Sequence, residues 1–121
     1  MKHQKKKREL GRNEGQRKAL LKTLLGSLIL NEKIQTTEAK AKESKNAIDK
    51  LITKAKKSQE PAKKLAILRD LNKLIPKIAV KKMLSEEFLK KFSERNSGYT
   101  RIIKLERRKS DGARIAVIEF V

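Results

Sequence analysis

Apolar side chains between residues 14 and 31 recur at helical spacing. They fall at alternating steps of one and three, which places them along one stripe of an α-helix: Leu20, Leu21, Leu24, Leu25, Leu28 and Ile29. Asn13 precedes Gln16 by three residues, the spacing of a capping box in which each side chain bonds the other residue's backbone N–H. The pattern predicts a first helix that begins near Glu14 and turns this stripe toward a core.

The stretch KIQT, residues 33–36, interrupts the helical pattern and predicts a brief strand because it contains β-branched residues. Either Thr36 or Thr37 can cap a second helix, with Glu38 in the first turn, where an acidic side chain is favourable. The inner face of this second helix is predicted to consist of Ile48, Leu51, Ile52 and Ala55.

Two prolines mark the limits of a third helix. Pro61 suits a first helical turn, because its missing N–H has no partner to lose there, and Pro76 should end or kink the helix at Ile75. The apolar stripe of this helix is predicted to be Leu65, Leu68, Leu71 or Leu74, and Ile75. Residues 77–92 indicate one or two further short helices, with a restart at Ser85 and Glu86.

The last quarter of the chain has the composition of strands. YTRIIKLE (99–106) and RIAVIEFV (114–121) are β-branched and aromatic runs, and Asp111 followed by Gly112 between them is a strong hairpin signal. Two strands alone are marginal in water, so we expect residues 33–36 to join them as a third strand that packs against the helices. The predicted fold is α+β: a single globular domain over residues 13–121, preceded by an extended basic arm at residues 1–12.

The charge of the chain points to a polyanionic partner. Thirty-three Lys and Arg residues against fourteen Asp and Glu give a net charge of +19, and self-repulsion of this size opposes compaction unless a counter-charge is present. The basic residues are spread over the arm, the helices and the hairpin. This distribution favours burial within a large folded RNA over the reading of one DNA groove by a single element.

Several protein classes are disfavoured by what the sequence lacks. It has no apolar stretch long enough to span a membrane, and the basic arm is not followed by the apolar segment of a signal peptide, so we expect a soluble protein that binds no membrane. With no Cys and a single His, most nucleophile–base pairs and metal cages are absent. Glu86 and Glu87 are adjacent and diverge on a helix, which is typical of exposed first-turn acids. Neither catalysis nor a cofactor nor a metal site is expected.

The aromatic side chains bear on how RNA could be bound. Phe88, Phe92 and Phe120 are predicted to pack in the core, which leaves no platform on which single-stranded bases could stack. Tyr99 follows a loop that contains glycine, so anchoring in the core and contact with RNA both remain open for it.

The arm itself has two interpretations. It is either a solvated tail or a limb that becomes ordered on RNA. Six Lys and Arg residues against one acid within residues 2–12, together with the local flexibility that Gly11 allows, favour the limb.

Several segments occur in the order typical of one protein family. LGR (10–12) and RKALLKTLLGSLI (17–29) come first, followed by EKIQTTEAKAKE (32–43) and LITKAK (51–56), and GYTRIIKLERRKSDGARIAVIEFV (98–121) ends the chain. With these segments the chain resembles the L-seventeen family of bacterial large-subunit ribosomal proteins. The resemblance covers essentially the whole chain, and IQTTEAKAKE and GYTRIIKL are its most specific parts.

The resemblance implies a cytoplasmic structural protein of the ribosome that binds and stabilises large-subunit (23S) ribosomal RNA. It further implies a place on the solvent side near the exit-tunnel opening, beside other large-subunit proteins, with no small-molecule substrate and no homo-oligomer. The residues expected to contact RNA are Lys2, His3, Lys5, Lys6, Lys7, Arg8, Arg12, Arg17, Lys18 and Lys22 in the N-terminal part, and Tyr99, Thr100, Arg101, Arg107, Arg108 and Lys109 around the hairpin.

Two other function classes remain as alternatives. A DNA-binding protein of the nucleoid type would share the charge, and equal affinity for ribosomal RNA and duplex DNA would favour it. An RNA-processing enzyme would need an acid–base pair that the sequence does not offer, so turnover abolished by one carboxylate substitution would be required to support it.

Overall fold

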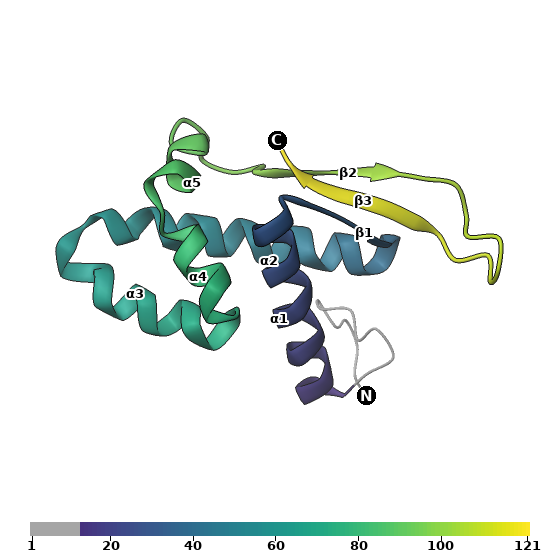
Figure 1. The fold of residues 1–121 in the computed structure, drawn as a ribbon, viewed down its shortest axis with the longest axis horizontal. Helices are drawn as coiled ribbons and strands as arrows, with labels where there is room; N and C mark the ends of the chain where they lie inside the picture. Colours follow the sequence, from purple (N-terminus) through teal and green to yellow (C-terminus); the bar gives the residue numbers. More distant parts are fainter. Residues whose placement is uncertain (1–12) are drawn as a thin grey trace, which may run out of the picture.

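The computed structural model describes residues 13–121, and the predictions for residues 1–12 lie outside the described residues. The described chain contains five α-helices, a short 3₁₀ helix and three strands (Figure 1). In chain order these elements are α1 (Glu14–Asn31), β1 (Lys33–Thr37), α2 (Glu38–Lys56), η1 (Lys57–Gln59), α3 (Pro61–Leu74), α4 (Lys77–Met83), α5 (Glu86–Lys91), β2 (Thr100–Lys104) and β3 (Ile115–Phe120).

The three strands form one antiparallel sheet in the order β1–β3–β2, so the last strand of the chain is the central one. Ile34, Ile118 and Ile102 stand opposite one another across the sheet, and Ile118 is fully buried in the core. Opposed residues on antiparallel strands share a face, so this row points toward the helices. The predicted α+β class and the predicted third strand are both confirmed.

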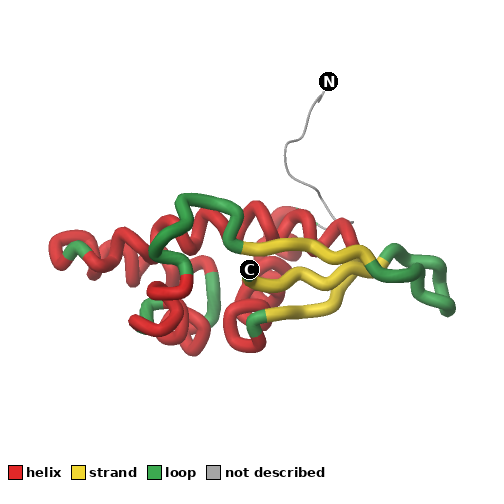
Figure 2. Tube along the Cα trace, turned by 90° about the horizontal axis from the view of Figure 1, so that it is seen from above, coloured by secondary structure: helices red, strands yellow, loops and turns green. Residues whose placement is uncertain are grey.

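Helix α2 lies along the sheet and also contacts the other helices (Figure 1). Its predicted inner face is confirmed, since Ile48, Leu51, Ile52 and Ala55 are all buried. Figure 2 views the molecule from above and shows the three strands side by side, with helices at one end of the sheet and the β2–β3 loop at the other. The described molecule is therefore elongated, with different elements at its two ends.

Helix α1 packs on the core with only its second half. Leu25, Leu28 and Ile29 are buried, so this part of the predicted stripe is confirmed. Leu20, Leu21 and Leu24 are only partly buried, because the N-terminal half of α1 extends away from the sheet and from α2 (Figure 1). The stripe is continuous in sequence, but the rest of the fold covers only one end of it.

The helix boundaries follow the local signals in the sequence. The capping box of α1 is complete, with the Gln16 N–H donating to Asn13 Oδ1 at 2.9 Å and the Asn13 N–H donating to Gln16 Oε1 at 3.2 Å. Pro61 is the first residue of α3, and that helix ends just before Pro76. Ser85 Oγ accepts a hydrogen bond from the Phe88 N–H at 3.3 Å, which confirms the predicted restart.

The predicted core face of α3 is partly wrong. Leu65 is 59% exposed, whereas Ile67, which the prediction omitted, is 7% exposed. Helix α3 folds back on η1 and α2, and this contact turns Ile67 and Leu71 inward, one helical turn apart. Leu74 is 46% exposed, so Leu71 is the core member of the two alternatives.

Four aromatic rings pack together where α5 meets the C-terminal strands. Phe92 is the centre of the cluster, with ring centroids at 5.2 Å from Phe88, 5.3 Å from Phe120 and 5.5 Å from Tyr99. Phe88 and Phe120 also meet edge to face at 5.4 Å. Edge-to-face contacts of this kind are favourable beyond the area that they bury. The prediction of core packing is confirmed for Phe88 and Phe92, which are buried, whereas Phe120 is partly buried and packs against the core.

Helix α1 passes close to the turn that joins α3 and α4, and this approach needs a glycine. Gly26 is buried in the middle of α1, and a Cβ atom added to it would lie 2.9 Å from Pro76 Cδ and 3.0 Å from Cγ. The pyrrolidine ring is rigid and cannot move aside as a flexible side chain could. The packing of the two elements therefore excludes a methyl group at residue 26.

We expect Gly26→Ala to destabilise the protein by about 1–3 kcal/mol, the usual cost of overpacking a core. This sign is opposite to that of an ordinary Gly→Ala change in a helix, which stabilises by up to about 1 kcal/mol. Gly15→Ala is the matched control on the same helix, since a Cβ there meets only Asn13 Oδ1 at 3.7 Å, an ordinary contact. Urea denaturation of both variants tests the prediction, and it is wrong if Gly26→Ala is as stable as Gly15→Ala.

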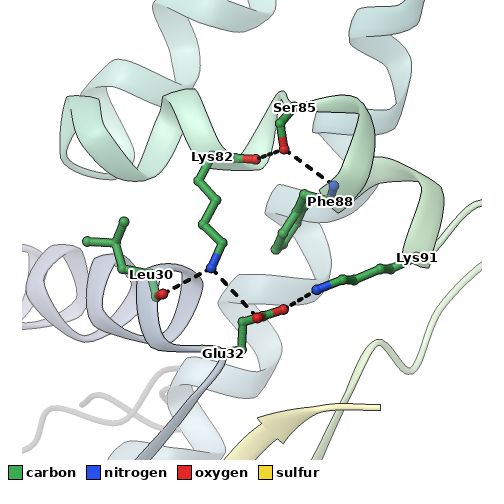
Figure 3. A network of polar contacts seen from close by, with 6 residues as sticks. All are labelled: Leu30, Glu32, Lys82, Ser85, Phe88 and Lys91. Carbon is green, nitrogen blue, oxygen red and sulfur yellow. Dashed lines mark hydrogen bonds and ion pairs between the residues drawn. The ribbon is translucent and has the colours of Figure 1, made fainter.

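The C-terminal end of α1 is tied to α4 and α5 by a network of polar contacts (Figure 3). Glu32 follows α1 with φ of 65°, in the left-handed region, and its carboxylate accepts a hydrogen bond from Lys91 Nζ. Lys82 Nζ lies 3.9 Å from the same carboxylate and donates to the Leu30 carbonyl oxygen at 2.9 Å. The hydrogen bond from Lys91 lowers the pKa of Glu32 below its ordinary value of 4.5, against the opposing effect of burial and with added help from Lys82.

This network predicts a contribution to stability that is lost in acid. A carboxyl group whose pKa is lowered by folding stabilises the folded state above its unfolded pKa, and the contribution disappears as the pH falls through the folded pKa. The Glu32 side chain is 41% exposed, so solvent screening limits the contribution to about 1 kcal/mol or less. We expect Glu32→Gln to lower the urea midpoint at pH 7, and we expect the difference from the wild type to shrink as the pH falls below the ordinary pKa of 4.5. An equal difference at pH 7 and below that pKa would contradict the prediction.

Candidate nucleic-acid interface

The loop that joins β2 to β3 projects beyond the end of the sheet (Figure 1) and is held by its own hydrogen bonds. The Leu105 N–H donates to Ile115 O at 2.9 Å, and the Arg108 N–H donates to Ala113 O at 2.8 Å. The Gly112 N–H returns to Arg108 O at 2.8 Å, and Gly112 adopts φ of 70°, which the predicted Asp-Gly turn signal anticipates. We call residues 105–114 the hairpin loop. Its backbone is ordered although nearly all its side chains are exposed.

The hairpin loop presents cations that have few internal partners. Arg108 Nε lies 3.2 Å from Asp111 Oδ1, whereas Arg107 and Lys109 are exposed and make no ion pair within the described part of the chain. Arg114 accepts a hydrogen bond on its carbonyl oxygen from the Glu38 N–H at 2.9 Å. This bond joins the base of the hairpin loop to the first turn of α2. The position of Arg107 and Lys109 relative to α2 is therefore defined.

Glu38, the acidic residue at the start of α2, forms ion pairs with two lysines. Lys42 Nζ lies 2.9 Å from Glu38 Oε1, and Lys104 Nζ of strand β2 lies 3.5 Å from the same oxygen. The hydrogen bond from Lys42 lowers the pKa of Glu38, opposed by burial and supported by the charge of Lys104. Glu38 therefore stays ionised, and part of the negative charge near the hairpin loop is already compensated.

Two of the residues predicted to contact RNA belong to the interior. Tyr99 is 1% exposed, its ring packs on Phe92, and its hydroxyl donates to the Arg95 carbonyl oxygen at 3.2 Å. Thr100 is 3% exposed at the start of β2. Of the two alternatives for Tyr99, the structure shows core anchoring, because the aromatic cluster covers its ring. Tyr99 and Thr100 are therefore corrected to core residues.

The neighbouring Arg101 differs from them, because its side chain is exposed. It lies on the face of the sheet that points away from the helices, opposite Glu119 of β3. Arg101 Nη2 is 3.6 Å from Glu119 Oε2, and the arginine side chain is 61% exposed. An exposed pair of this kind contributes little to stability, so the guanidinium can exchange the carboxylate for another anion at small cost.

The predicted residues on α1 lie in its N-terminal half. Lys18 pairs with Glu14 at 3.4 Å through two side chains that are each about three-quarters exposed, and Lys22 is exposed one turn further along. Arg17 is partly buried and already interacts within the protein. Figure 1 places this half of α1 and the hairpin loop on separate projections of the molecule. The structure thus does not bring the predicted residues together into one pocket.

A basic groove between α2 and α3 contains none of the residues predicted to contact RNA. The groove has a volume of about 590 Å³ and is lined by Asp49, Lys50, Thr53, Lys54, Lys57, Lys63, Ala66 and Ile67. Lys50, Lys54 and Lys57 are spaced at i, i+4 and i+7, the helical spacing that places residues on one face. The lysine spacing in the sequence indicates the α2 wall of the groove. The α3 wall cannot be predicted in this way, because it depends on how α3 folds back on α2.

No helix within residues 13–121 is long and apolar enough to cross a membrane. Within the same residues, His, Cys, Asp and Glu side chains form no group of three that could hold a metal ion.

Comparison with known proteins gives consistent matches. A family model described as ribosomal protein L17 matches residues 20–121. Large ribosomal subunit protein bL17 of Chlorobium chlorochromatii is 46% identical over 114 residues, which cover 94% of this chain and 71% of that protein. The bL17 proteins of Shouchella clausii and Staphylococcus carnosus are 43% and 42% identical, with 93% and 94% of this chain covered and 97% and 98% of their own lengths.

Proposed function

The chain belongs to the ribosomal protein L17 family, and from this premise we propose that it binds and stabilises large-subunit ribosomal RNA during assembly and translation. Membership of this family supports a structural role in the large ribosomal subunit. The relatives are bacterial proteins named large ribosomal subunit protein bL17. The proposal includes contact with RNA and a cytoplasmic setting near the exit-tunnel opening. It also includes contact with neighbouring large-subunit proteins. We further propose that the protein is a monomer and has no small-molecule substrate.

The hairpin loop is the observation that carries the RNA-binding part of the proposal. Its backbone is fixed by internal hydrogen bonds, so binding through Arg107 and Lys109 requires little ordering of the chain. Arginine can hydrogen-bond two phosphate oxygens at once through its planar guanidinium. Together with the net charge of +19, this exposed loop supports a partner that is rich in phosphate.

The proposed contacts fall into two groups. Around the hairpin they are Arg101, Arg107, Arg108 and Lys109, and on α1 they are Arg17, Lys18 and Lys22. Lys2, His3, Lys5, Lys6, Lys7, Arg8 and Arg12 complete the set but lie outside the described residues. Phosphate contacts of this kind give affinity and position, and they carry no base sequence.

Competition between nucleic acids tests the proposal. We expect the purified chain to prefer a folded large-subunit ribosomal RNA transcript over duplex DNA of equal nucleotide content at 0.15 M salt, a value at which exposed charges are partly screened (a Debye length of about 8 Å). Equal affinity would support the DNA-binding alternative instead. Sedimentation of the tagged chain with large subunits checks the assignment in cells, and its absence from the large-subunit fraction would contradict it.

No observation favours the enzymatic alternative. The relatives are ribosomal proteins. Of the acids of the described chain that have perturbed pKa values, Glu32 follows α1, whereas Glu38 and Asp49 lie about three helical turns apart on α2 and cannot form an acid–base pair. We therefore propose a structural protein and no catalytic step.

A further inference from the structure

The sheet has two open edges within residues 13–121, because β1 and β2 both lie on the outside of β3. On the β2 side, the Val121 N–H donates to Tyr99 O at 3.0 Å. At the other end of the same ladder, the Leu105 N–H donates to Ile115 O at 2.9 Å. Backbone groups alternate between the two sides of an antiparallel strand. The N–H and C=O groups of residues 100, 102 and 104 therefore face away from β3, and they have no backbone partner in the described part of the chain.

The two open edges differ in the side chains beside them. On the face of the sheet that points away from the helices, β1 carries only polar residues, namely Lys33, Gln35 and Thr37. On the same face of the β2 side, Ile103 is 42% exposed and Leu105 is 43% exposed. Polar and charged side chains protect an edge strand from pairing with another chain, whereas an exposed apolar edge favours such pairing. The β2 edge is therefore the better template for an added strand.

The apolar surface continues from the β2 edge across the sheet. Ile103 stands opposite Val117 of β3, which is partly buried. Leu105 and Ile115 help to line a hollow of about 460 Å³ at the base of the hairpin loop. These side chains are aliphatic, and this face of the three strands carries no aromatic ring on which a base could stack. The surface therefore suits apolar side chains of a polypeptide better than nucleotides.

Cations beside the edge determine the charge of a suitable partner. Five Lys and Arg residues against one acid lie within residues 100–109. The side chains of Arg101 and Lys104 are 61% and 70% exposed. Lys104 pairs with Glu38 of α2, so its ammonium group is held on the helix side of the sheet and leaves Ile103 uncovered. A second copy of β2 would bring cations against cations, which is unfavourable between neighbouring strands, whereas an acidic strand is complementary.

We propose that the free edge of β2 is a docking site for an extended acidic segment of another protein, which adds to the sheet as a fourth strand. The backbone of this segment pairs with residues 100, 102 and 104. Its apolar side chains pack on Ile103 and Leu105, and its carboxylates meet Arg101 and Lys104. In strand addition of this kind, backbone hydrogen bonds provide affinity and alternate side chains provide selectivity. The inference does not rest on RNA as a partner, so it stands or fails separately from the proposed function.

Synthetic peptides test the chemistry of the partner. A fluorescent peptide of alternating Val and Glu is titrated with the full chain at about 0.15 M salt. We expect saturable binding that is roughly tenfold or more tighter than that of a peptide of alternating Ser and Glu, which has the same charge but no apolar side. Equal affinities would overturn the inference, because charge alone would then explain the binding.

Backbone methylation tests whether the peptide binds as a strand. One peptide is N-methylated at its Val residues and another at its Glu residues. Only one side of an added strand faces β2, so we expect one of the two methylated peptides to lose binding and the other to keep it. Unchanged binding of both methylated peptides would overturn the inference.

Two substitutions at residue 104 separate the backbone from the charge. Lys104→Pro removes the free N–H and the cation, whereas Lys104→Gln removes the cation alone. Proline is accommodated on an edge strand where the N–H faces solvent, and circular dichroism checks that both variants are folded. We expect Lys104→Pro to bind the Val and Glu peptide roughly tenfold more weakly than Lys104→Gln. Equal affinities of the two variants would contradict strand addition.

A pair of double variants tests the apolar contacts. Ile103→Ser with Leu105→Ser is expected to weaken peptide binding roughly tenfold. The control is Leu74→Ser with Ile78→Ser, which removes apolar side chains that are 46% and 64% exposed on α3 and α4. Equal losses in the two double variants would overturn the inference.

Hydrogen exchange identifies what covers the edge. We expect the peptide to protect the amides of residues 102 and 104 in the full chain. Protection by an RNA oligonucleotide but not by the peptide would assign the edge to RNA, and self-association of the free chain through β2 would assign it to a second copy. Either result would overturn the inference.

Discussion

Removal of residues 1–12 is expected to lower affinity for large-subunit ribosomal RNA by about 100-fold or more at 0.15 M salt and to leave the thermal midpoint nearly unchanged. The segment holds six Lys and Arg against one Glu. If each cation neutralises one phosphate, the salt slope should fall by about 4 to 5. The buried core residues lie between Leu25 and Ile118, and the capping box starts at Asn13, so the deletion removes none of them.

Filter binding over a salt series, with a melting curve for each protein, measures both parts of this prediction. A control variant keeps the length of the segment and replaces its six Lys and Arg residues by Gln. If charge is responsible, this variant should lose affinity as the deletion does. Wild-type affinity in the deletion variant would support the solvated-tail interpretation of the segment.

Phe92→Ala is expected to cost about 3–5 kcal/mol of unfolding free energy, the usual range for a large aromatic side chain in a core. Phe92 is 1% exposed and its ring contacts those of Phe88, Tyr99 and Phe120. Its loss therefore opens a cavity where α5, the connection to β2, and β3 meet. For a domain with a total stability of about 5–15 kcal/mol, this change removes a large part of the margin.

Urea denaturation followed by circular dichroism measures the effect of Phe92→Ala. Leu65→Ala is the comparison, because Leu65 is a large apolar residue that is 59% exposed on α3, and changes at such sites are usually within about 0.5 kcal/mol. Similar midpoints for the two variants would show that the aromatic cluster does not stabilise the fold as its geometry indicates.

The helix starts could be predicted because their signals are local. The Asn13–Gln16 capping box, Pro61 at the start of α3 and Ser85 before α5 each act within a few residues, and all three are confirmed. The core face of α3 could not be predicted in the same way. Both Leu65 and Ile67 are apolar, and only the packing of α3 on η1 and α2 decides which of them is buried.

The candidate nucleic-acid interface, like the helices, could be predicted from the sequence where its signals are local and not where it depends on packing. The Asp111–Gly112 signal correctly indicated the turn that carries Arg107 and Lys109. The Tyr99 ring packs on Phe92, and Lys56 of α2 approaches it from a distant part of the chain, with Nζ 5.3 Å from the ring centroid, so sequence alone left its role open. The α2–α3 groove likewise exists only because two helices meet, and a lysine spacing on one of them does not reveal the other wall.

The strand order has a consequence for how the chain is made. Residues 33–37 and 100–104 both pair with residues 115–120, which follow both of them in the chain. A nascent chain emerges from its N-terminus, so β1 and β2 have no shared partner until residues 115–120 have been made, although α1 to α5 can form earlier. Contacts between residues so far apart in sequence also carry a high loop-closure cost. The sheet is therefore completed only after residues 115–120 have been made, and a truncation before residue 115 removes the central strand rather than an edge.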